Sequence, residues 1–223
     1  MVSIFYYLFD MSRRISNKRK AELGLGLGTG ADYKPWITTS EFNSRGTTAV
    51  IKDWKTGRGV HCLSQAEANW YYILRWDDNN IDIREQYPLD RRITERIAFE
   101  NGFKHPGNSD YIMTTDFLAT RADGTYHAYS IKSGYDDLFE RDYEKLCIEK
   151  LYWKSFGTEF TILTKAEVNS VYAANIRLIT EFWDASTVYD EISAIKHKLA
   201  HKEIETDLEN TVLSAEQLRR LNK

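Results

Sequence analysis

Residues 112–132, IMTTDFLATRADGTYHAYSIK, contain two runs that are typical of β-strands on either side of a turn signal. The runs Ile112–Thr120 and Tyr126–Lys132 are rich in β-branched and aromatic residues, which favour extended backbone. Between them, Ala122–Thr125 includes the Asp-Gly pair that is common in tight hairpin turns. The stretch therefore predicts an antiparallel hairpin, and the hairpin decides which polar side chains share a face of the sheet.

Asp116 and Lys132 are the two hairpin residues that are candidates for chemistry. Asp116 lies in mid-strand among apolar neighbours, where an ionised carboxylate is costly to bury unless a partner compensates its charge. That partner is either a divalent cation or an arginine across the sheet. Lys132 ends the second strand, where it either stabilises negative charge on a reacting group or simply extends into solvent. Taken singly, each residue is better explained by the structural alternative.

The length of the turn decides whether Asp116 and Lys132 lie on the same face, because side chains alternate between faces at every residue. A two-residue turn sends them to opposite faces. A three-residue loop, Asp123–Thr125, sets Asp116 opposite Lys132 and puts Ser130 on the same face. Gly124 supplies the left-handed conformation that such a loop needs. We therefore expect an odd-length loop, or a bulge before Asp116.

A helix is predicted at Ser64–Trp76, and it carries a third candidate residue, Glu67. Ser64 and Glu67 have the spacing of a capping box, and apolar residues follow at helical intervals. Alone, Glu67 is best explained as the return partner of that cap. Together with Asp116 and Lys132, it completes the set of hard oxygen ligands and cation that metal-dependent phosphodiester hydrolysis requires.

The remaining pattern predicts an α/β nuclease-like domain followed by a small helical C-terminal domain. We place the boundaries at residues 1–49 for a basic N-terminal segment, 50–165 for the nuclease-like domain and 166–223 for the helical domain. The further elements expected are strands at Ile81–Tyr87 and Phe160–Leu163, and helices at Tyr135–Phe156, Ala166–Trp183, Val188–Lys202 and Ser214–Leu221.

The N-terminal segment is basic and contains a glycine-rich stretch, Gly24–Gly30, that we interpret as a flexible connector without a ligand. Residues 1–58 carry ten Lys and Arg against five acids, net +5, whereas residues 59–223 carry 20 against 28, net −8. A basic N-terminal region followed by an acidic remainder fits a chain that binds phosphate groups in one region. From charge alone, a solvated tail is the simpler explanation.

Cysteine content and the first residues bear on the compartment. Cys62 and Cys147 are the only cysteines, which excludes a disulfide framework and a zinc finger and favours a reducing compartment. The apolar run Met1–Met11 is too short to span a membrane, and its basic residues follow it instead of preceding it. We therefore expect a cytoplasmic protein with no membrane partner.

Several longer runs, in order over roughly residues 50–180, are more specific than any single motif. They resemble the nuclease domain of the TnsA family. The runs are Trp54–Arg58 (WKTGR), Leu63-Ser64 leading to Glu67, Ile81–Leu89 (IDIREQYPL), His105-Pro106, Met113–Leu118 (MTTDFL), Glu144–Leu146 and Tyr152-Trp153.

The resemblance implies a restriction-endonuclease-like fold of the PD-(D/E)xK type with a mixed sheet. It implies catalysis by Glu67, Asp116 and Lys132, with Mg²⁺ (Mn²⁺ as a substitute) bound by the two acids and the backbone carbonyl of Ile131. Family members cut double-stranded DNA at the 5′ ends of Tn7-like transposons. They act with TnsB, a DDE transposase, and TnsC, an ATPase regulator. Each of these properties is an expectation for this chain.

One departure from the family pattern is Ser130, which stands where Gln or Glu is usual, two residues before the lysine. Its hydroxyl is shorter and uncharged, although it is able to hold a metal-bound water. The departure keeps two alternatives open beside an active transposase nuclease. One is a non-catalytic recruitment subunit that retains the fold, and the other is a stand-alone restriction-type nuclease.

The C-terminal helices are the candidate surface for partners. Their apolar side chains exceed what a small domain buries alone, so we expect part of the set to dock on TnsC or TnsB. Packing against the nuclease-like domain is an equally good explanation. The residues concerned are Ile176, Ile179, Phe182 and Trp183.

Overall fold

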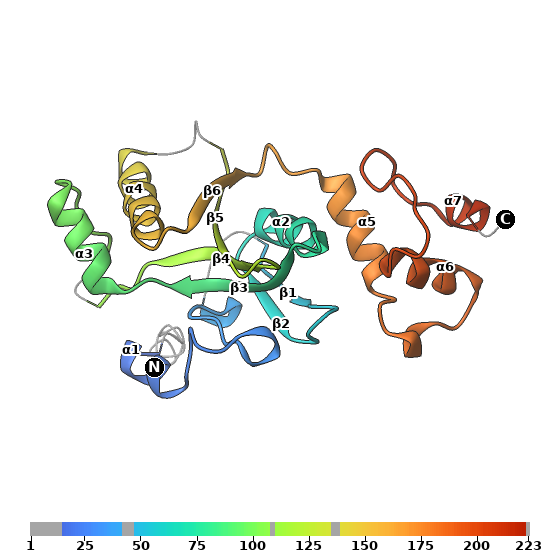
Figure 1. The fold of residues 1–223 in the computed structure, drawn as a ribbon, viewed down its shortest axis with the longest axis horizontal. Coiled ribbons are helices and arrows are strands. Elements are labelled where there is room, and N and C mark those ends of the chain that lie inside the picture. The colour runs from blue at the N-terminus through green and yellow to red at the C-terminus, as the bar shows by residue number, and fades with distance from the viewer. Residues whose placement is uncertain (1–14, 42–46, 108–109, 135–138, 222–223) are drawn as a thin grey trace, which may run out of the picture.

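The computed structural model describes residues 15–41, 47–107, 110–134 and 139–221, and it is built around a four-stranded mixed sheet (Figure 1). The strand order is β3-β4-β5-β6, in which β5 and β6 are parallel and the other neighbours are antiparallel. The expected mixed sheet is therefore confirmed. Its strands are β3 (Asn80–Pro88), β4 (Thr114–Arg121), β5 (Tyr126–Lys132) and β6 (Glu159–Thr164).

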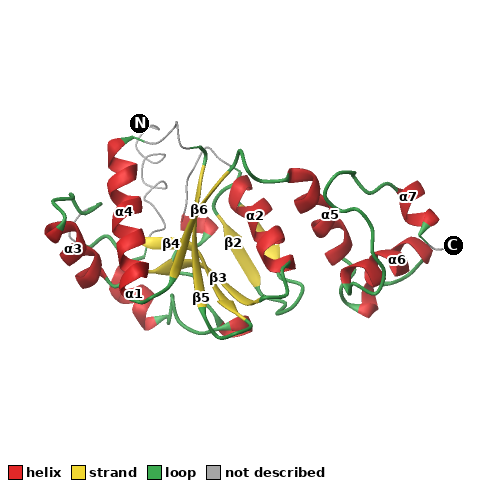
Figure 2. Cartoon of the chain, turned by 45° about the horizontal axis from the view of Figure 1, so that its top comes forward, coloured by secondary structure: helices red, strands yellow, loops and turns green. Residues whose placement is uncertain are grey.

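Helices cover both faces of this sheet (Figure 2). Along β4, Phe117 packs in a cluster with residues of α2 (Gln65–Trp76), whereas Leu118 packs in a second cluster with residues of α3 (Arg91–Glu100) and α4 (Glu140–Ser155). This alternation follows from the two-residue period of a strand. It places Leu118 on the α4 side of the sheet and Phe117 on the α2 side. The alternation is interrupted before Phe117, because Thr115 also faces α4, through Glu149 and Trp153.

The β4–β5 hairpin has a three-residue loop, as expected, but the loop is one residue earlier than predicted. Arg121 pairs with Thr125 through its N–H (2.8 Å), and Gly124 has a φ of 84°. Asp123 accepts hydrogen bonds from the backbone N–H (2.9 Å) and hydroxyl (2.7 Å) of Thr125, which draws Thr125 into the ladder. The predicted pairing of Asp116 with Lys132 is therefore wrong, since the observed ladder ends with Phe117 opposite Tyr129, two residues short of the predicted register. The predicted shared face is retained.

The first half of the chain contains four elements that the sequence pattern did not predict. A two-stranded hairpin precedes α2, and α3 follows β3 with Asp90 as its N-cap. The four are α1 (Asn17–Glu22), β1 (Ala49–Lys52), β2 (Gly59–Cys62) and α3, and single 3-10 turns occur at Gly30–Asp32, Thr39–Glu41 and Ala185–Thr187.

The glycine-rich stretch is packed against β3, so its interpretation as a flexible connector is wrong. Gly26 donates its N–H to the carbonyl of Lys34 (2.6 Å), and the N–H of Lys34 bonds to Leu27 (3.1 Å). A Cβ on Gly26 would lie 2.4 Å from Cγ of Pro88. The glycines therefore provide left-handed backbone and close approach, and the segment forms an ordered layer on the sheet edge.

The C-terminal region is helical, as predicted, and begins after β6. It contains α5 (Ser170–Thr180), α6 (Glu191–Ala200) and α7 (Ala215–Arg220). Ile176 is fully buried in the cluster that includes α2, and Ile179 is fully buried among α6 and α7 residues. These two side chains are internal contacts, and that of Ile176 agrees with the alternative of packing against the nuclease-like domain, while docking of part of the set on TnsC or TnsB stays a prediction. The long helix expected from Tyr135 begins at Glu140 in the described part, and residues 135–138 lie outside it.

Candidate active site

A cavity of about 670 Å³ opens between the N-terminal end of α2, the sheet and α4. It brings together every site residue expected from the sequence, from elements far apart in the chain. Trp70 of α2 donates its indole N–H to the carbonyl of Thr164 (2.9 Å), which fixes the helix against the end of β6. The expected residues that line the cavity are Glu67, Asp116, Ser130, Ile131 and Lys132.

Asp116 is the centre of the hydrogen bonds at the cavity floor. Its Oδ2 accepts the backbone N–H of Ile131 (2.6 Å) and a long bond from the hydroxyl of Ser130 (3.5 Å), and the Lys132 ammonium is 3.7 Å away. Its Oδ1 accepts only the carboxamide of Gln86 (3.4 Å) among the described residues. The carboxylate is thus held on one side and open on the other.

Lys132 lies over the end of its own strand. Its Nζ donates to the Ser130 hydroxyl (2.7 Å) and to the carbonyl oxygen of Ile131 (3.1 Å), the predicted metal ligand. Burial alone would lower the pKa of Lys132, but the charges of Asp116, Glu149 and Glu67 outweigh it and raise that pKa. The lysine is therefore a cation over the physiological pH range.

Glu67 enters the cavity from the first turn of α2. Ser64 caps the helix as predicted, accepting the Glu67 N–H (3.1 Å), while the Glu67 carboxylate accepts the Leu63 N–H (2.8 Å) and the Ser64 hydroxyl (3.0 Å). Burial, followed by the charge of Asp116, raises the pKa of Glu67 to about 8. The Glu67 carboxylate therefore caps the helix and also lines the cavity.

Glu149 of α4 is a further acid of this cavity that the sequence analysis missed. It is buried and accepts a hydrogen bond from Thr115 (2.7 Å), whose hydroxyl also accepts the indole N–H of Trp153 (2.7 Å). Burial raises the pKa of Glu149 to about 7, with Asp116 contributing and Lys132 opposing. A glutamate beside Ile148 on the inner side of a long helix was the available signal.

The donor set of the cavity fits a hard divalent cation. Two carboxyl groups, Glu67 and Asp116, and the Ile131 carbonyl offer oxygen donors to the cavity, and burial followed by the charge of Asp116 raises the pKa of Glu67. Within the described residues, no three His, Cys, Asp or Glu side chains are grouped so that they alone hold a metal. Magnesium suits such a site, because it keeps several waters and needs few protein ligands.

Comparison with known proteins gives the family of the chain. A family model described as the TnsA-like endonuclease N-terminal domain matches residues 77–165, which include β3 to β6. The Transposon Tn7 transposition protein TnsA of Escherichia coli is 37% identical over 182 residues. The chain belongs to the TnsA family. The match covers 79% of this chain and 64% of the Escherichia coli protein, so the TnsA chain described here spans less than two thirds of that relative's length.

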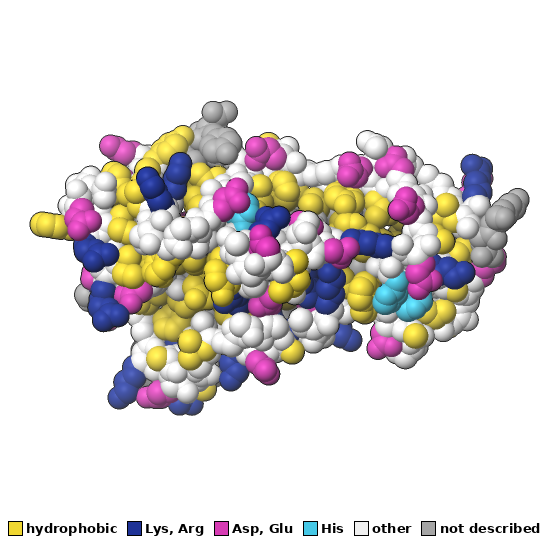
Figure 3. Space-filling model, viewed as in Figure 1, with side chains coloured by type: hydrophobic (Ala, Val, Ile, Leu, Met, Phe, Trp, Pro, Cys, Tyr) yellow, Lys and Arg dark blue, Asp and Glu magenta, His cyan; other side chains and the backbone are white. Residues whose placement is uncertain are grey.

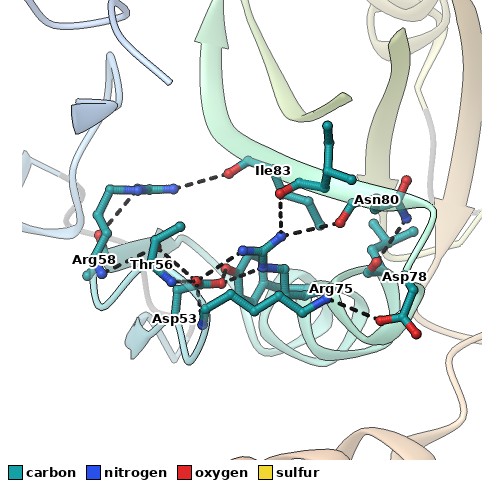
Figure 4. A network of polar contacts seen from close by, with 12 residues as sticks. Asp53, Thr56, Arg58, Arg75, Asp78, Asn80 and Ile83 are labelled. Atoms are coloured by element: carbon teal, nitrogen blue, oxygen red, sulfur yellow. Dashed lines mark hydrogen bonds and ion pairs between the residues drawn. The ribbon is translucent and has the colours of Figure 1, made fainter. Parts of the chain in front are cut away.

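Within this TnsA chain, the motif Trp54–Arg58 that helped to indicate the family has a structural role. Asp53, just before it, accepts bonds from Arg75 (2.7 and 3.3 Å) and from the backbone N–H (2.6 Å) and hydroxyl (2.8 Å) of Thr56 (Figure 4). Arg58 pairs with the buried Glu85 (2.7 Å). The motif therefore joins the β1–β2 hairpin to α2 and β3 and leaves the cavity lining to other residues.

The Ser130 departure has a defined geometry in this TnsA chain. Its hydroxyl accepts from Lys132 (2.7 Å) and lies 3.5 Å from the Asp116 carboxylate. A Gln or Glu at this position would extend further into the cavity. The Ser130 hydroxyl instead accepts a hydrogen bond from Lys132 and so helps to position the lysine.

Proposed function

We propose that this protein is the metal-dependent DNA endonuclease subunit of a heteromeric transposase, hydrolysing phosphodiester bonds at the 5′ ends of the transposon during cut-and-paste transposition. One observation carries the proposal. Glu67, Asp116 and Lys132 come from a helix and two strands and line one cavity, with Asp116 and Lys132 3.7 Å apart. Membership of the TnsA family supports it.

The residues that would hold Mg²⁺ are Glu67, Asp116 and the carbonyl of Ile131. When bound, the metal supplies an activated water and neutralises charge on the scissile phosphate. Lys132 places an ammonium beside the same carboxylate, where it binds a phosphoryl oxygen or orients the attacking water. Glu149, with its pKa near 7, is able to take up or release a proton at neutral pH.

The proposed substrate is double-stranded DNA at the transposon ends, and the proposed partners are TnsB and TnsC. On the face shown in Figure 3, basic and acidic side chains of the described residues are interspersed, without an extended basic surface. Residues 59–223 also carry 20 basic and 28 acidic residues, net −8, whereas a nuclease that binds DNA alone needs a larger basic surface, and this favours action within a complex. None of the described helices is long and apolar enough to cross a membrane. We propose that the protein acts in the bacterial cytoplasm, at the nucleoid.

A cleavage assay on transposon-end DNA, with and without the two partners, tests this function. We expect 5′-end cleavage only with Mg²⁺ or Mn²⁺ and only in the presence of partners, and Asp116→Asn should reduce it by at least about a thousandfold, the scale of losing an essential electrostatic group. Asp123→Asn, in the exposed hairpin loop, is the matched control. Full activity of Asp116→Asn would exclude the proposed site.

Metal binding is tested separately by calorimetry. We expect the wild-type protein to bind Mg²⁺ or Mn²⁺ in preference to Zn²⁺, because the ligands are oxygens without His or Cys. Asp116→Ala should abolish binding. Equal binding by that variant would remove Asp116 from the metal site.

Two alternatives are distinguished by the same experiments. A non-catalytic recruitment subunit would support assembly with TnsB and TnsC but show no metal-dependent cleavage in any combination. A stand-alone restriction-type nuclease would cut DNA without partners. Retention of Glu67, Asp116 and Lys132 around one cavity favours the catalytic subunit over the first alternative.

A further inference from the structure

Gln86 adopts a backbone conformation that is unusual for its position. It lies in the middle of β3 with a φ of 48°, and it is 2% exposed. The ladder to β4 continues on both sides of it, with Glu85 paired with Phe117 and Tyr87 with Thr115. Left-handed backbone is unfavourable for a residue with a Cβ, so something must compensate at this point of the strand.

Both ends of the Gln86 carboxamide are used at the cavity. Its Nε2 donates to Oδ1 of Asp116 (3.4 Å), and its Oε1 accepts the hydroxyl of Thr114 (3.0 Å). The Gln86 main-chain carbonyl accepts the N–H of Trp36 (3.2 Å), from the N-terminal segment. The main-chain carbonyl of Gln86 therefore faces the N-terminal segment, and its side-chain carboxamide faces the cavity.

The two oxygens of Asp116 have different surroundings. Oδ2 faces the Ile131 N–H and the Lys132 ammonium, whereas Oδ1 has Gln86 as its hydrogen-bond partner among the described residues. A neutral amide orients a carboxylate without cancelling its charge. A lysine or arginine in the same place would neutralise Oδ1 and compete with a bound cation.

We propose that Gln86 is a positioning residue for Asp116, which aims Oδ1 at the metal site, and that the strained backbone of β3 is retained for this purpose. The inference rests on the proposed metal-dependent function. It assigns to β3 a role in metal affinity, and it makes the cross-strand neighbour of the catalytic aspartate part of the site.

Gln86→Asn tests this proposal, because Asn keeps the amide, tolerates left-handed backbone better and is one methylene shorter. In calorimetry of the full chain with Mg²⁺ and no DNA, we expect the Kd to rise about tenfold, at the low end of what removal of a ligand-orienting group produces. The thermal midpoint of the metal-free protein should be unchanged or higher. Gln86→Gly, which also relieves the strain, should weaken Mg²⁺ binding in the same way.

The control is Lys202→Gly, at the other left-handed non-glycine residue of the described chain (φ 57°), which is exposed in the C-terminal region. It should leave Mg²⁺ binding unchanged. Wild-type Mg²⁺ affinity in Gln86→Asn and Gln86→Gly would overturn the inference about Gln86 while leaving the proposed function intact. Weaker binding that follows a lowered thermal midpoint in both variants would also overturn it, as a purely structural role. Absence of Mg²⁺ binding by the wild-type protein would instead contradict the proposed function.

Discussion

Two groups of charged side chains are buried against the same sheet, one around Asp53 and one around Asp116. The Asp53 carboxylate is fully compensated by its neighbours. Both of its oxygens accept hydrogen bonds from Arg75, and Tyr71 and Thr56 add hydroxyl donors (Figure 4). Burial alone would raise the pKa of Asp53, but the hydrogen bond and charge of Arg75 outweigh it and lower the pKa to about 2.

The group around Asp116 has the opposite balance. Four acids, Glu67, Asp116, Asp142 and Glu149, line its cavity, and Lys132 forms an ion pair with Asp116. Burial raises the pKa of both glutamates. The comparison shows how a structural charge cluster differs from a candidate site in one protein. The Asp53 carboxylate is neutralised by an arginine, whereas the cavity around Asp116 holds two glutamates whose pKa values are raised.

Removing the arginine of the closed cluster should have the largest effect. Arg75→Met leaves Asp53 buried without its counter-ion, and we expect a loss of about 3–5 kcal/mol in the free energy of unfolding. Denaturant unfolding measures it. Arg177→Met, at an exposed arginine of α5, is the control and should change stability by less than about 0.5 kcal/mol. A loss below about 1 kcal/mol for Arg75→Met would contradict the account of this cluster.

Neutralising an acid of the open cluster should stabilise the metal-free protein. A carboxyl whose pKa is raised on folding favours the folded state while protonated, so this contribution is present below pH 4.5 and is lost as pH rises to about 8. Glu67→Gln should therefore raise stability at pH 8 by about 1–3 kcal/mol and flatten the decline between pH 4.5 and 8. Thermal unfolding across this range, with exposed Glu216→Gln as control, measures it.

Asp53 predicts a pH dependence of the opposite sign, since its folded pKa is lowered. Its contribution to stability is present above the ordinary value of 3.8 and is lost as pH falls towards 2. A pH series extended down to about 2 therefore separates the two clusters. A Glu67→Gln protein that is less stable than wild type at pH 8 would show that this carboxylate is compensated in the metal-free state.

Lysines at the cavity rim should contribute to DNA binding. Lys145 and Lys165 line the cavity, and neither makes an ion pair within the described part of the chain. Lys145→Ala and Lys165→Ala should each weaken binding by about three- to tenfold and reduce the salt slope by about 1. Lys150→Ala, exposed on the same helix as Lys145 and outside the cavity, is the control for binding measured over a salt series. An unchanged salt slope would place the DNA elsewhere.

The smallest effect is expected at Ser130. Ser130→Gln restores the residue type usual in the family, and we expect cleavage to stay within about threefold of wild type or to rise, since Lys132 retains its contacts with Asp116 and Ile131. Single-turnover cleavage measures it. Complete loss of activity would mean that the Ser130 hydroxyl has a role of its own.

The parts of this site that local rules govern were predictable from the sequence. The shared face of Asp116 and Lys132 follows from strand alternation, and the start of α2 follows from the Ser64 cap. The register was wrong by one step in the loop because the Asp123 side chain selects Thr125 as a ladder residue. A side-chain bond of this kind is not visible in a hydropathy pattern.

The parts that depend on tertiary contacts were not predictable. Glu149 and Gln86 join the cavity only because α4 and β3 pack beside β4, and the place of Glu149 on the inner side of its helix does not by itself put it next to Asp116. Helix α3 was missed because its sequence, RRITERIAFE, is largely polar and shows only a short apolar stripe. The glycine-rich stretch was wrongly predicted to be flexible, because glycine is typical both of flexible linkers and of ordered backbone with positive φ.

The packing of the N-terminal segment has a practical consequence for anyone who trims this protein to a minimal fragment. Tyr33 is buried and donates its hydroxyl to the carbonyl of Glu85, and Trp36 bonds to the carbonyl of Gln86. The region matched by the family model, residues 77–165, excludes this segment and the helix that carries Glu67. Expressed alone, residues 77–165 would lack these contacts, and we expect that fragment not to fold independently. Truncations and fusion junctions should therefore leave the segment from residue 15 onward in place.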